Sequence, residues 1–270
     1  MKYHVPVLLK ESIEGLNINP KGIYIDATFG GGGHSAAILS KLEDGHLFGF
    51  DQDADAKQNA FDSEKFTFVY HNFAYVKNFM QFFEVGQVDG ILADLGVSSH
   101  HFDDAERGFS FRFDAPLDMR MDRTVKKSAA NVVNEYDEQE LTRIFKMYGE
   151  IANARRLAQE IVSHRSVCPI QTTEDLKKIG QRFCNPQTES KFLSQIFQAL
   201  RIEVNNEMQA LKDFLQGGLQ ILKPGGRFVV ITYHSLEDRL VKNFFKTGNV
   251  DADFRREYIF ENVDFSEVTE

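Results

Sequence analysis

Short apolar runs alternate with amphipathic stretches over the first hundred residues, and this rhythm constrains the fold more than any other feature of the sequence. It is typical of βαβ units, in which helices connect neighbouring parallel strands. The apolar runs predict four strands, at residues 22–28, 46–51, 66–72 and 88–95. Helices are expected to begin near His34, Asp53 and Tyr75.

The rhythm changes after Leu95, and residues 131–197 follow a helical period, as the spacing of Leu141, Ile144 and Tyr148 illustrates. Two capping boxes are predicted in this stretch, one from Asp137 with Glu140 and one from Thr172 with Asp175. These patterns indicate a helical insertion into the α/β arrangement.

The α/β pattern resumes near the end of the chain. One long amphipathic helix is expected from Val204 to Leu222, closed by a Lys-Pro-Gly-Gly sequence and followed by a strand at 227–233. We therefore predict an α/β fold with a doubly wound, mostly parallel sheet. The predicted domains are a discontinuous α/β domain, 1–108 and 198–270, and a helical insertion, 109–197.

Composition narrows the class of protein. Cys168 and Cys184 are the only cysteines among the 270 residues, and neither has a ligand-spaced partner, so we expect neither a disulfide scaffold nor a metal site. No run approaches the roughly 18 apolar residues of a membrane span, and the N-terminal apolar stretch is too short for a secretion signal. A cytoplasmic protein without membrane attachment is expected, and a homo-oligomer is compatible with the sequence.

The formal charge of −9 argues against a general nucleic-acid binder, because phosphate contacts need Lys and Arg. Residues 107–127 are nevertheless locally basic. Within them, basic side chains are interleaved with aromatic ones, a combination that suits phosphate anchoring and base stacking. The candidate RNA contacts are Arg107, Phe109, Arg112 and Arg120. A solvated loop with a few core aromatics is the alternative.

A glycine-rich segment from Asp26 to His34 follows the first predicted strand and opens the first helix, where open α/β sheets bind nucleotide-like ligands. The dinucleotide pattern needs a third glycine, and Ser35 stands at that position. Asp26 would repel a pyrophosphate, whereas the ammonium and sulfonium of S-adenosylmethionine would attract it. These residues favour the methyl donor, and a tight turn without ligand is the alternative.

Polar or aromatic residues follow the other predicted strands. Asp51 is placed to accept hydrogen bonds from a ribose diol, although capping a helix is an alternative that fits Asp53 better. Phe73 is a candidate for the adenine face, with plain core packing as its alternative. Asp94 is expected at the rim where a transferred methyl group would sit, since a buried, unpaired carboxylate is costly without a function.

Seven blocks of sequence resemble the bacterial 16S ribosomal RNA cytosine-N4 methyltransferases, a family with a class I, Rossmann-like fold. They are 4–9 (HVPVLL), 26–35 (DATFGGGGHS), 94–99 (DLGVSS), 107–111 (RGFSF), 116–122 (PLDMRMD), 197–205 (FQALRIEVN) and 234–239 (HSLEDR). The resemblance implies that Gly32, Gly33, His34, Asp51, Phe73 and Asp94 contact S-adenosylmethionine. It also implies a cytidine of 16S ribosomal RNA, free or in the small subunit, as the target. His101 replaces the family's usual Gln, and the tail after Thr247 is acidic where the family has a basic one.

A cytosine amino group is a poor nucleophile, so oxygen acceptors for its N–H bonds are needed. Because no D/N/S-P-P-Y motif is present, candidate catalytic residues are Asp94, Asp118, His234 and Glu237, with Ser235 as a substrate contact. An Asp118–Arg120 ion pair and a Ser235–Asp238 helix cap are the alternatives. Competing functions are methylation of a metabolite or DNA, a non-catalytic assembly factor and, more distantly, a nucleotide oxidoreductase.

Overall fold

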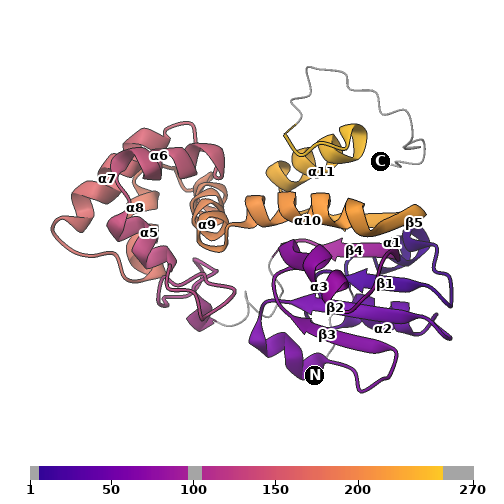
Figure 1. Ribbon diagram of the computed structural model, residues 1–270. Helices are drawn as coiled ribbons and strands as arrows, with labels where there is room; N and C mark the ends of the chain where they lie inside the picture. Colours follow the sequence, from indigo (N-terminus) through magenta and orange to yellow (C-terminus); the bar gives the residue numbers. More distant parts are fainter. Residues whose placement is uncertain (1–5, 97–104, 252–270) are drawn as a thin grey trace. The chain divides into compact units, whose positions relative to one another are not determined.

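The computed structural model describes residues 6–96 and 105–251. The chain forms two compact units, which we call the sheet unit (residues up to 96 and from 208) and the helical unit (residues 97–207). Figure 1 shows the elements of both. Within the described ranges, no helix combines the length and the apolar character needed to cross a membrane.

Within the described residues, five parallel strands form the sheet, in the order β3-β2-β1-β4-β5. They are β1 (Ile23–Asp26), β2 (His46–Asp51), β3 (Phe66–Tyr70), β4 (Val88–Asp94) and β5 (Leu222–Ile231). The predicted strands are confirmed. β5 starts earlier than expected because Leu222 already pairs with Val88, and a register shift then precedes the regular pairing of Arg227 with Gly90.

Helices cover both faces of this sheet, so the doubly wound α/β fold is confirmed. The elements outside the sheet are α1 (Leu9–Leu16), α2 (Gly33–Leu39), η1 (Ala54–Asn59), η2 (Phe73–Tyr75), α3 (Val76–Phe82), α10 (Glu207–Ile221) and α11 (Ser235–Thr247). Successive residues of β1 alternate between the faces: Tyr24 packs with α1 and α2, whereas Ile25 packs with α3, α10 and α11. The helix expected near Asp53 is a short 3₁₀ segment, η1.

The prediction of one long helix from Val204 to Leu222 is wrong. Val204 belongs to α9 (Glu189–Asn205), and α10 starts separately at Glu207. Asn206 separates the two helices with φ 51° and ψ 38°, and its N–H donates to the carbonyl of Ile202. Asparagine tolerates this left-handed conformation, which ends helices. The apolar period of the sequence continues across this break, so periodicity alone does not reveal where α9 ends and α10 begins.

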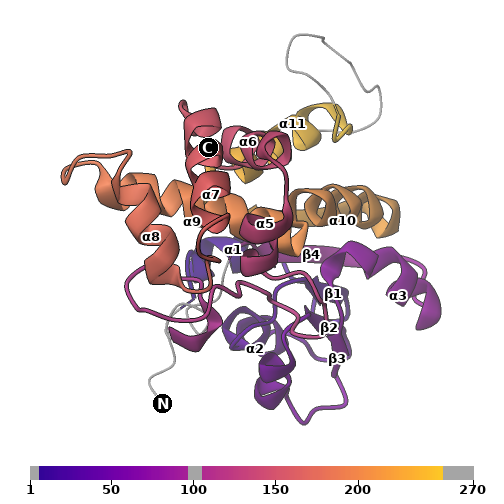
Figure 2. The same ribbon diagram turned by 90° about the vertical axis from the view of Figure 1, so that its left-hand side faces the viewer.

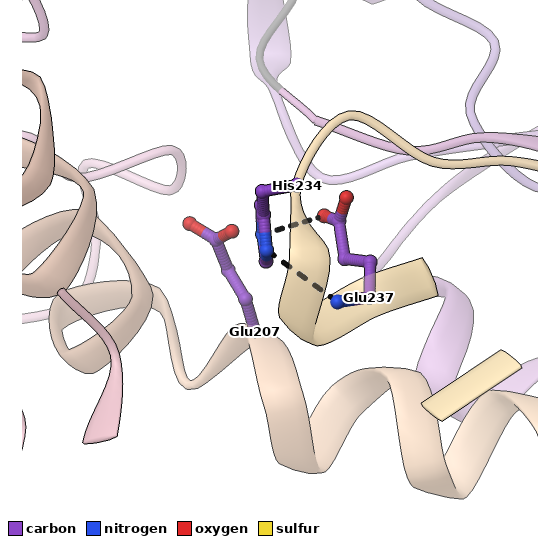
Figure 3. Close-up of side chains that lie close together, drawn as sticks. All are labelled: Glu207, His234 and Glu237. Carbon is purple, nitrogen blue, oxygen red and sulfur yellow. Dashed lines mark hydrogen bonds and ion pairs between the residues drawn. The ribbon is translucent and has the colours of Figure 1, made fainter. Parts of the chain in front are cut away.

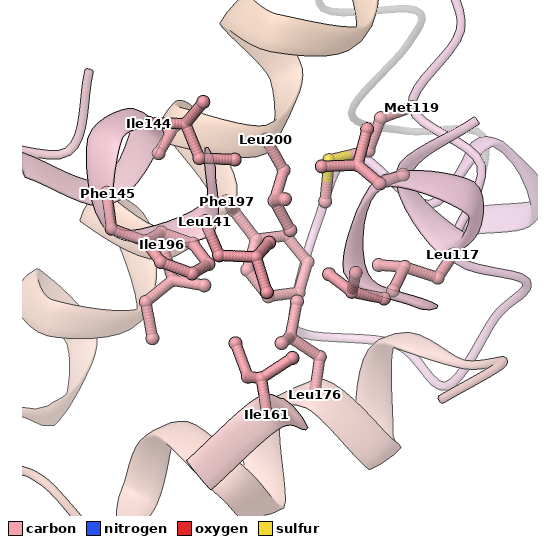
Figure 4. Close-up of a cluster of buried hydrophobic side chains, with 14 of the residues drawn as sticks. Leu117, Met119, Leu141, Ile144, Phe145, Ile161, Leu176, Ile196, Phe197 and Leu200 are labelled. Atoms are coloured by element: carbon pink, nitrogen blue, oxygen red, sulfur yellow. The ribbon is translucent and has the colours of Figure 1, made fainter. Parts of the chain in front are cut away.

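The helical unit consists of helices around one apolar core (Figures 2 and 4). They are η3 (Ala105–Arg107), α5 (Ala129–Glu135), α6 (Glu138–Met147), α7 (Ala154–Arg165), α8 (Thr173–Gln181) and α9. Both predicted capping boxes are present, at the starts of α6 and α8. Leu141 and Ile144 of α6 are fully buried in this core, as their spacing indicated, and Phe145 is buried beside them.

Candidate active site

Carboxylates end three of the parallel strands, Asp26 on β1, Asp51 on β2 and Asp94 on β4. Parallel strands present their carboxyl ends at one edge of the sheet, and the strand order reverses between β1 and β4. Ligands of open α/β sheets bind at such a reversal. Thr28 joins the two strand ends, because its Oγ1 accepts the Asp94 N–H at 2.7 Å while its own N–H donates to Asp26 at 3.1 Å.

The glycine loop is tied to the end of β2 through Asp51. One carboxylate oxygen of Asp51 accepts the Gly30 N–H and the other accepts the Asp53 N–H, both at 2.8 Å. Asp53 in turn caps η1 by accepting the Asp55 N–H, so the cap falls on Asp53 as expected. Asp51 therefore holds the loop against the sheet edge.

The glycines of the loop serve different purposes. A Cβ on Gly33 would lie 2.3 Å from Pro6, and one on Gly32 would lie 3.0 Å from Phe61. Protein packing therefore requires glycine at both positions. A Cβ on Gly31 would meet nothing within 4 Å, and Gly31 is exposed. Of these three glycines, only Gly31 has open space beside its backbone, and sequence reasoning did not single out this position.

Asp26 lies beneath this loop and is 1% exposed. Its carboxylate accepts a 2.6 Å hydrogen bond from Ser35, the residue that replaces the dinucleotide-type glycine. Burial raises the pKa of Asp26, and the hydrogen bonds from Ser35 and Thr28 offset this only in part. Direct contact between Asp26 and a cationic ligand does not fit such burial. Asp26 fixes the loop through its hydrogen bonds with Thr28 and Ser35.

The raised pKa of Asp26 has a measurable consequence for stability. Between the unfolded pKa of about 4 and the higher folded pKa, the native state binds more protons than the unfolded state, so stability falls as pH rises. Urea titrations should therefore show that the free energy of unfolding of Asp26→Asn rises relative to that of wild type as the pH is raised from 4 to 8. Asp44→Asn, which removes an exposed carboxylate, should show no such rise. Parallel pH profiles for wild type and Asp26→Asn would contradict the expectation.

Asp94 is 22% exposed and is paired, contrary to the expectation of an unpaired carboxylate. Its Oδ1 accepts a hydrogen bond from the Tyr233 hydroxyl at 2.7 Å. Its Oδ2 lies 3.8 Å from Nδ1 of His34, which is buried at the start of α2. Burial raises the pKa of Asp94, although Tyr233 and His34 both oppose the shift. Sequence reasoning missed Tyr233, whose only signal was its place at the end of the strand predicted at 227–233.

His234 and Glu237 lie together at the start of α11, as Figure 3 shows. Their side chains are 9% and 6% exposed, and His234 Nε2 lies 3.1 Å from Glu237 Oε1. The other oxygen of Glu237 accepts the Tyr233 N–H at 3.0 Å. His234 caps α11, so the predicted Ser235–Asp238 cap is wrong. Ser235 is exposed as the first residue of the helix.

Of the two other predicted cofactor contacts, Phe73 and His101, the structure describes only Phe73. Phe73 opens η2, is half-buried, and packs against Phe214 of α10 with 5.0 Å between ring centroids. Its packing supports the core alternative. His101 lies outside the described residues.

Asp118 of the helical unit forms a two-pronged ion pair with Arg120, with contacts of 2.6 and 2.8 Å. Burial alone would raise the pKa of Asp118, but the hydrogen bonds and charge of Arg120 lower it below the ordinary value. Arg120 also donates to the Arg123 and Val125 carbonyls. The structural ion pair foreseen as the alternative is therefore present.

Arg107 and Phe109 are core residues of the helical unit, which corrects their assignment as RNA contacts. Arg107 is 2% exposed and donates to the carbonyls of Arg120 and Met121. Phe109 is 5% exposed within the apolar cluster. Arg112, by contrast, is exposed, and the neighbouring Phe113 ring is 49% exposed. The alternation of basic and aromatic residues did not distinguish inward from outward side chains.

The sequence profile of the MraW methylase family matches residues 1–264. The chain belongs to this family. Proteins named "Ribosomal RNA small subunit methyltransferase H" are similar to it: that of Phocaeicola vulgatus is 56% identical over 97% of this chain and 86% of its own length. That of Bacteroides fragilis is 58% identical over 93% of this chain and 83% of its own length. That of Flavobacterium johnsoniae is 55% identical over 96% of this chain and 86% of its own length.

Membership of the MraW methylase family confirms the resemblance seen in the sequence blocks and makes this chain a methyltransferase. Among solved structures, a putative methyltransferase from an antibiotic biosynthesis pathway of Anabaena variabilis aligns with 76% of this chain and 92% of its own. That alignment has 14% identity and a TM-score of 0.28, so the assignment rests on the family match alone.

Proposed function

We propose that this MraW family member transfers a methyl group from S-adenosylmethionine to the N4 amino group of a cytidine in 16S ribosomal RNA. The observation that carries the proposal is the carboxylate-lined sheet edge beside the glycine loop, in a chain whose relatives are named ribosomal RNA small subunit methyltransferases. A ribosomal RNA substrate would place the enzyme in the cytoplasm.

The residues at this edge fit the methyl donor. Gly31 leaves open space beside the backbone, Asp51 ends β2 where a ribose would lie, and Phe73 is only half-buried. The buried charge of Asp26 and the carboxylate of Asp94 favour a cationic ligand over a pyrophosphate. Gly32, Gly33 and His34 frame the start of α2 and would hold the donor through the backbone.

The chain's own residues supply position and a proton acceptor. When bound, S-adenosylmethionine would supply an electrophilic methyl carbon: the substrate nitrogen would bond to it while the sulfur keeps the electron pair of the broken carbon–sulfur bond. Asp94 is the residue that would accept the N–H of the target amino group, because it ends β4 and remains partly exposed. Glu237 is buried and His234 is nearly so, and together they hold the turn after β5. Ser235 would contact the substrate.

We assign RNA recognition to the helical unit. Its exposed side chains between 112 and 126 include Arg112, Phe113, Arg123 and Lys126. Arginine and lysine would anchor phosphates, and an exposed ring would stack on an unpaired base. A flipped or single-stranded cytidine reaches a buried methyl group at the lowest cost.

The direct experiment incubates the protein and labelled S-adenosylmethionine with small subunits from a strain that lacks the gene. We expect label on a cytidine N4, and absence of label from cytidine would refute the proposal. Competition by ribosomal RNA at low salt distinguishes this enzyme from one that methylates a metabolite.

The donor site itself can be tested at Gly31. Gly31→Val should lower the affinity for S-adenosylmethionine at least about tenfold in calorimetry, because the side chain would enter ligand space, while stability changes by less than about 1 kcal/mol. The matched control is Gly86→Val, since Gly86 is exposed and its added Cβ also meets nothing within 4 Å. Equal donor affinity in both variants would place the donor elsewhere.

A further inference from the structure

The hydroxyl of Tyr233 contacts the carboxylate on which the proposed chemistry depends. Tyr233 follows β5, and its Oη donates to Asp94 Oδ1 at 2.7 Å. The residue is 54% exposed, so this bond lies at an accessible point of the sheet edge. A tyrosine in this position can orient a neighbouring carboxylate without entering the reaction.

The tyrosine is held from two sides. Its backbone N–H donates to Glu237 Oε2 at 3.0 Å, which fixes the chain where β5 passes into α11. Gly96, just after β4, has φ 104°, and a Cβ there would lie 3.1 Å from Tyr233 Cδ2. The ring therefore rests against the backbone that follows Asp94, and the hydroxyl has a defined place.

The two oxygens of Asp94 have different surroundings. Oδ1 accepts the Tyr233 hydroxyl, whereas Oδ2 faces His34 Nδ1 at 3.8 Å, beyond hydrogen-bond length. His34 Nε2 lies 3.1 Å from the Val7 carbonyl oxygen, which can only accept a hydrogen bond. Nε2 therefore carries the proton of the neutral ring, and Nδ1 carries a proton only when the ring is charged. Oδ2 thus retains lone pairs for a further donor.

We propose that Tyr233 is a positioning residue, which holds Oδ1 of Asp94 so that Oδ2 accepts an N–H of the target amino group and then its proton. This inference rests on the proposed methyl transfer. The nitrogen gains one bond to carbon and must lose one proton to become neutral. That proton passes to Oδ2, which leaves Asp94 neutral until the proton reaches solvent.

The charges around Asp94 set the expected pH response. The charge of Asp94 raises the pKa of Asp26 on β1, His34 on α2 favours ionisation of Asp94 when protonated, and Glu237 on α11 lies near Tyr233. Burial raises the pKa of Asp94, and the Tyr233 hydrogen bond lowers it. Removing the hydroxyl should raise the pKa further, so the ionised acceptor appears only at higher pH.

The test is Tyr233→Phe, which keeps the ring and removes the hydroxyl. We expect kcat on small subunits at saturating donor to fall about tenfold near neutral pH, and its acid limb to move to higher pH. Carboxyl ¹³C NMR of the donor-free protein should show Asp94 titrating at higher pH, with thermal unfolding unchanged. Tyr75→Phe, which alters another half-exposed tyrosine of the sheet unit, is the control and should match wild type.

A double variant separates positioning from a general structural role. If Tyr233 acts through Asp94, adding Tyr233→Phe to Asp94→Asn should reduce kcat by less than about twofold further. An additive loss, or an unchanged acid limb and an unchanged Asp94 titration in Tyr233→Phe, would overturn the inference. Lack of methyl transfer by wild type would refute the proposed function instead, and the NMR titration would still decide whether Tyr233 controls Asp94.

Discussion

Asp94→Asn should lower kcat for methyl transfer about a hundredfold or more at saturating donor, the usual cost of losing a positioned proton acceptor. Asparagine keeps the shape of the side chain, and its carbonyl oxygen can still accept the Tyr233 hydroxyl that now donates to Oδ1. It cannot take a proton at the second position. Single-turnover transfer of labelled methyl to small subunits measures this effect directly.

The matched control for this prediction is Asp44→Asn, which removes the same charge from a 74% exposed carboxylate of the sheet unit. Its transfer rate should stay within about twofold of wild type, because surface charges of this kind contribute little. Wild-type transfer by Asp94→Asn would contradict the role of Asp94 as acceptor. The proton acceptor would then be another residue of the sheet edge.

Arg107→Ala should destabilise the helical unit by about 3 kcal/mol, measured by urea unfolding of the full chain. The guanidinium is buried, and its loss would leave the carbonyls of Arg120 and Met121 without this donor. Those carbonyls belong to the loop that also carries the Asp118–Arg120 ion pair. Weakened RNA binding would follow as a secondary result of the altered loop.

Arg112→Ala is the control, and we expect it to weaken RNA binding while leaving stability nearly unchanged. Because Arg112 is exposed, its loss should change stability by less than about 0.5 kcal/mol. RNA affinity should fall a few fold, and the salt dependence of binding should decrease by the equivalent of about one phosphate contact. Equal stability of the two variants would show that Arg107 does not hold the loop.

The arrangement of the sheet could be read from the sequence because strand periodicity and strand-end residues are local properties. The β2 boundaries at His46 and Asp51 were predicted as observed, and Asp94 was placed correctly at the end of β4. Capping boxes were equally readable, since Asp137 and Glu140 lie three residues apart in the chain. Local rules of this kind need no knowledge of tertiary packing.

The errors concern side chains whose direction depends on distant partners. Arg107 and Arg112 look alike in the sequence, yet only Arg107 meets the carbonyls of residues 120 and 121. Tyr233 lies far along the chain from Asp94, so no spacing rule joins them. Gly31 differs from Gly33 only because Pro6 fills the space at one and not at the other.

The placement of β5 beside β4 has a consequence for the nascent chain. β4 pairs with β5 on one side, but β5 begins only at Leu222, after the whole helical unit has been synthesised. Until then an edge of the half-built sheet has its hydrogen-bonding groups uncovered, which favours chaperone binding or misassembly. Tyr233 emerges from the ribosome later still, so a translating polypeptide should acquire methylating competence only after β5 has docked.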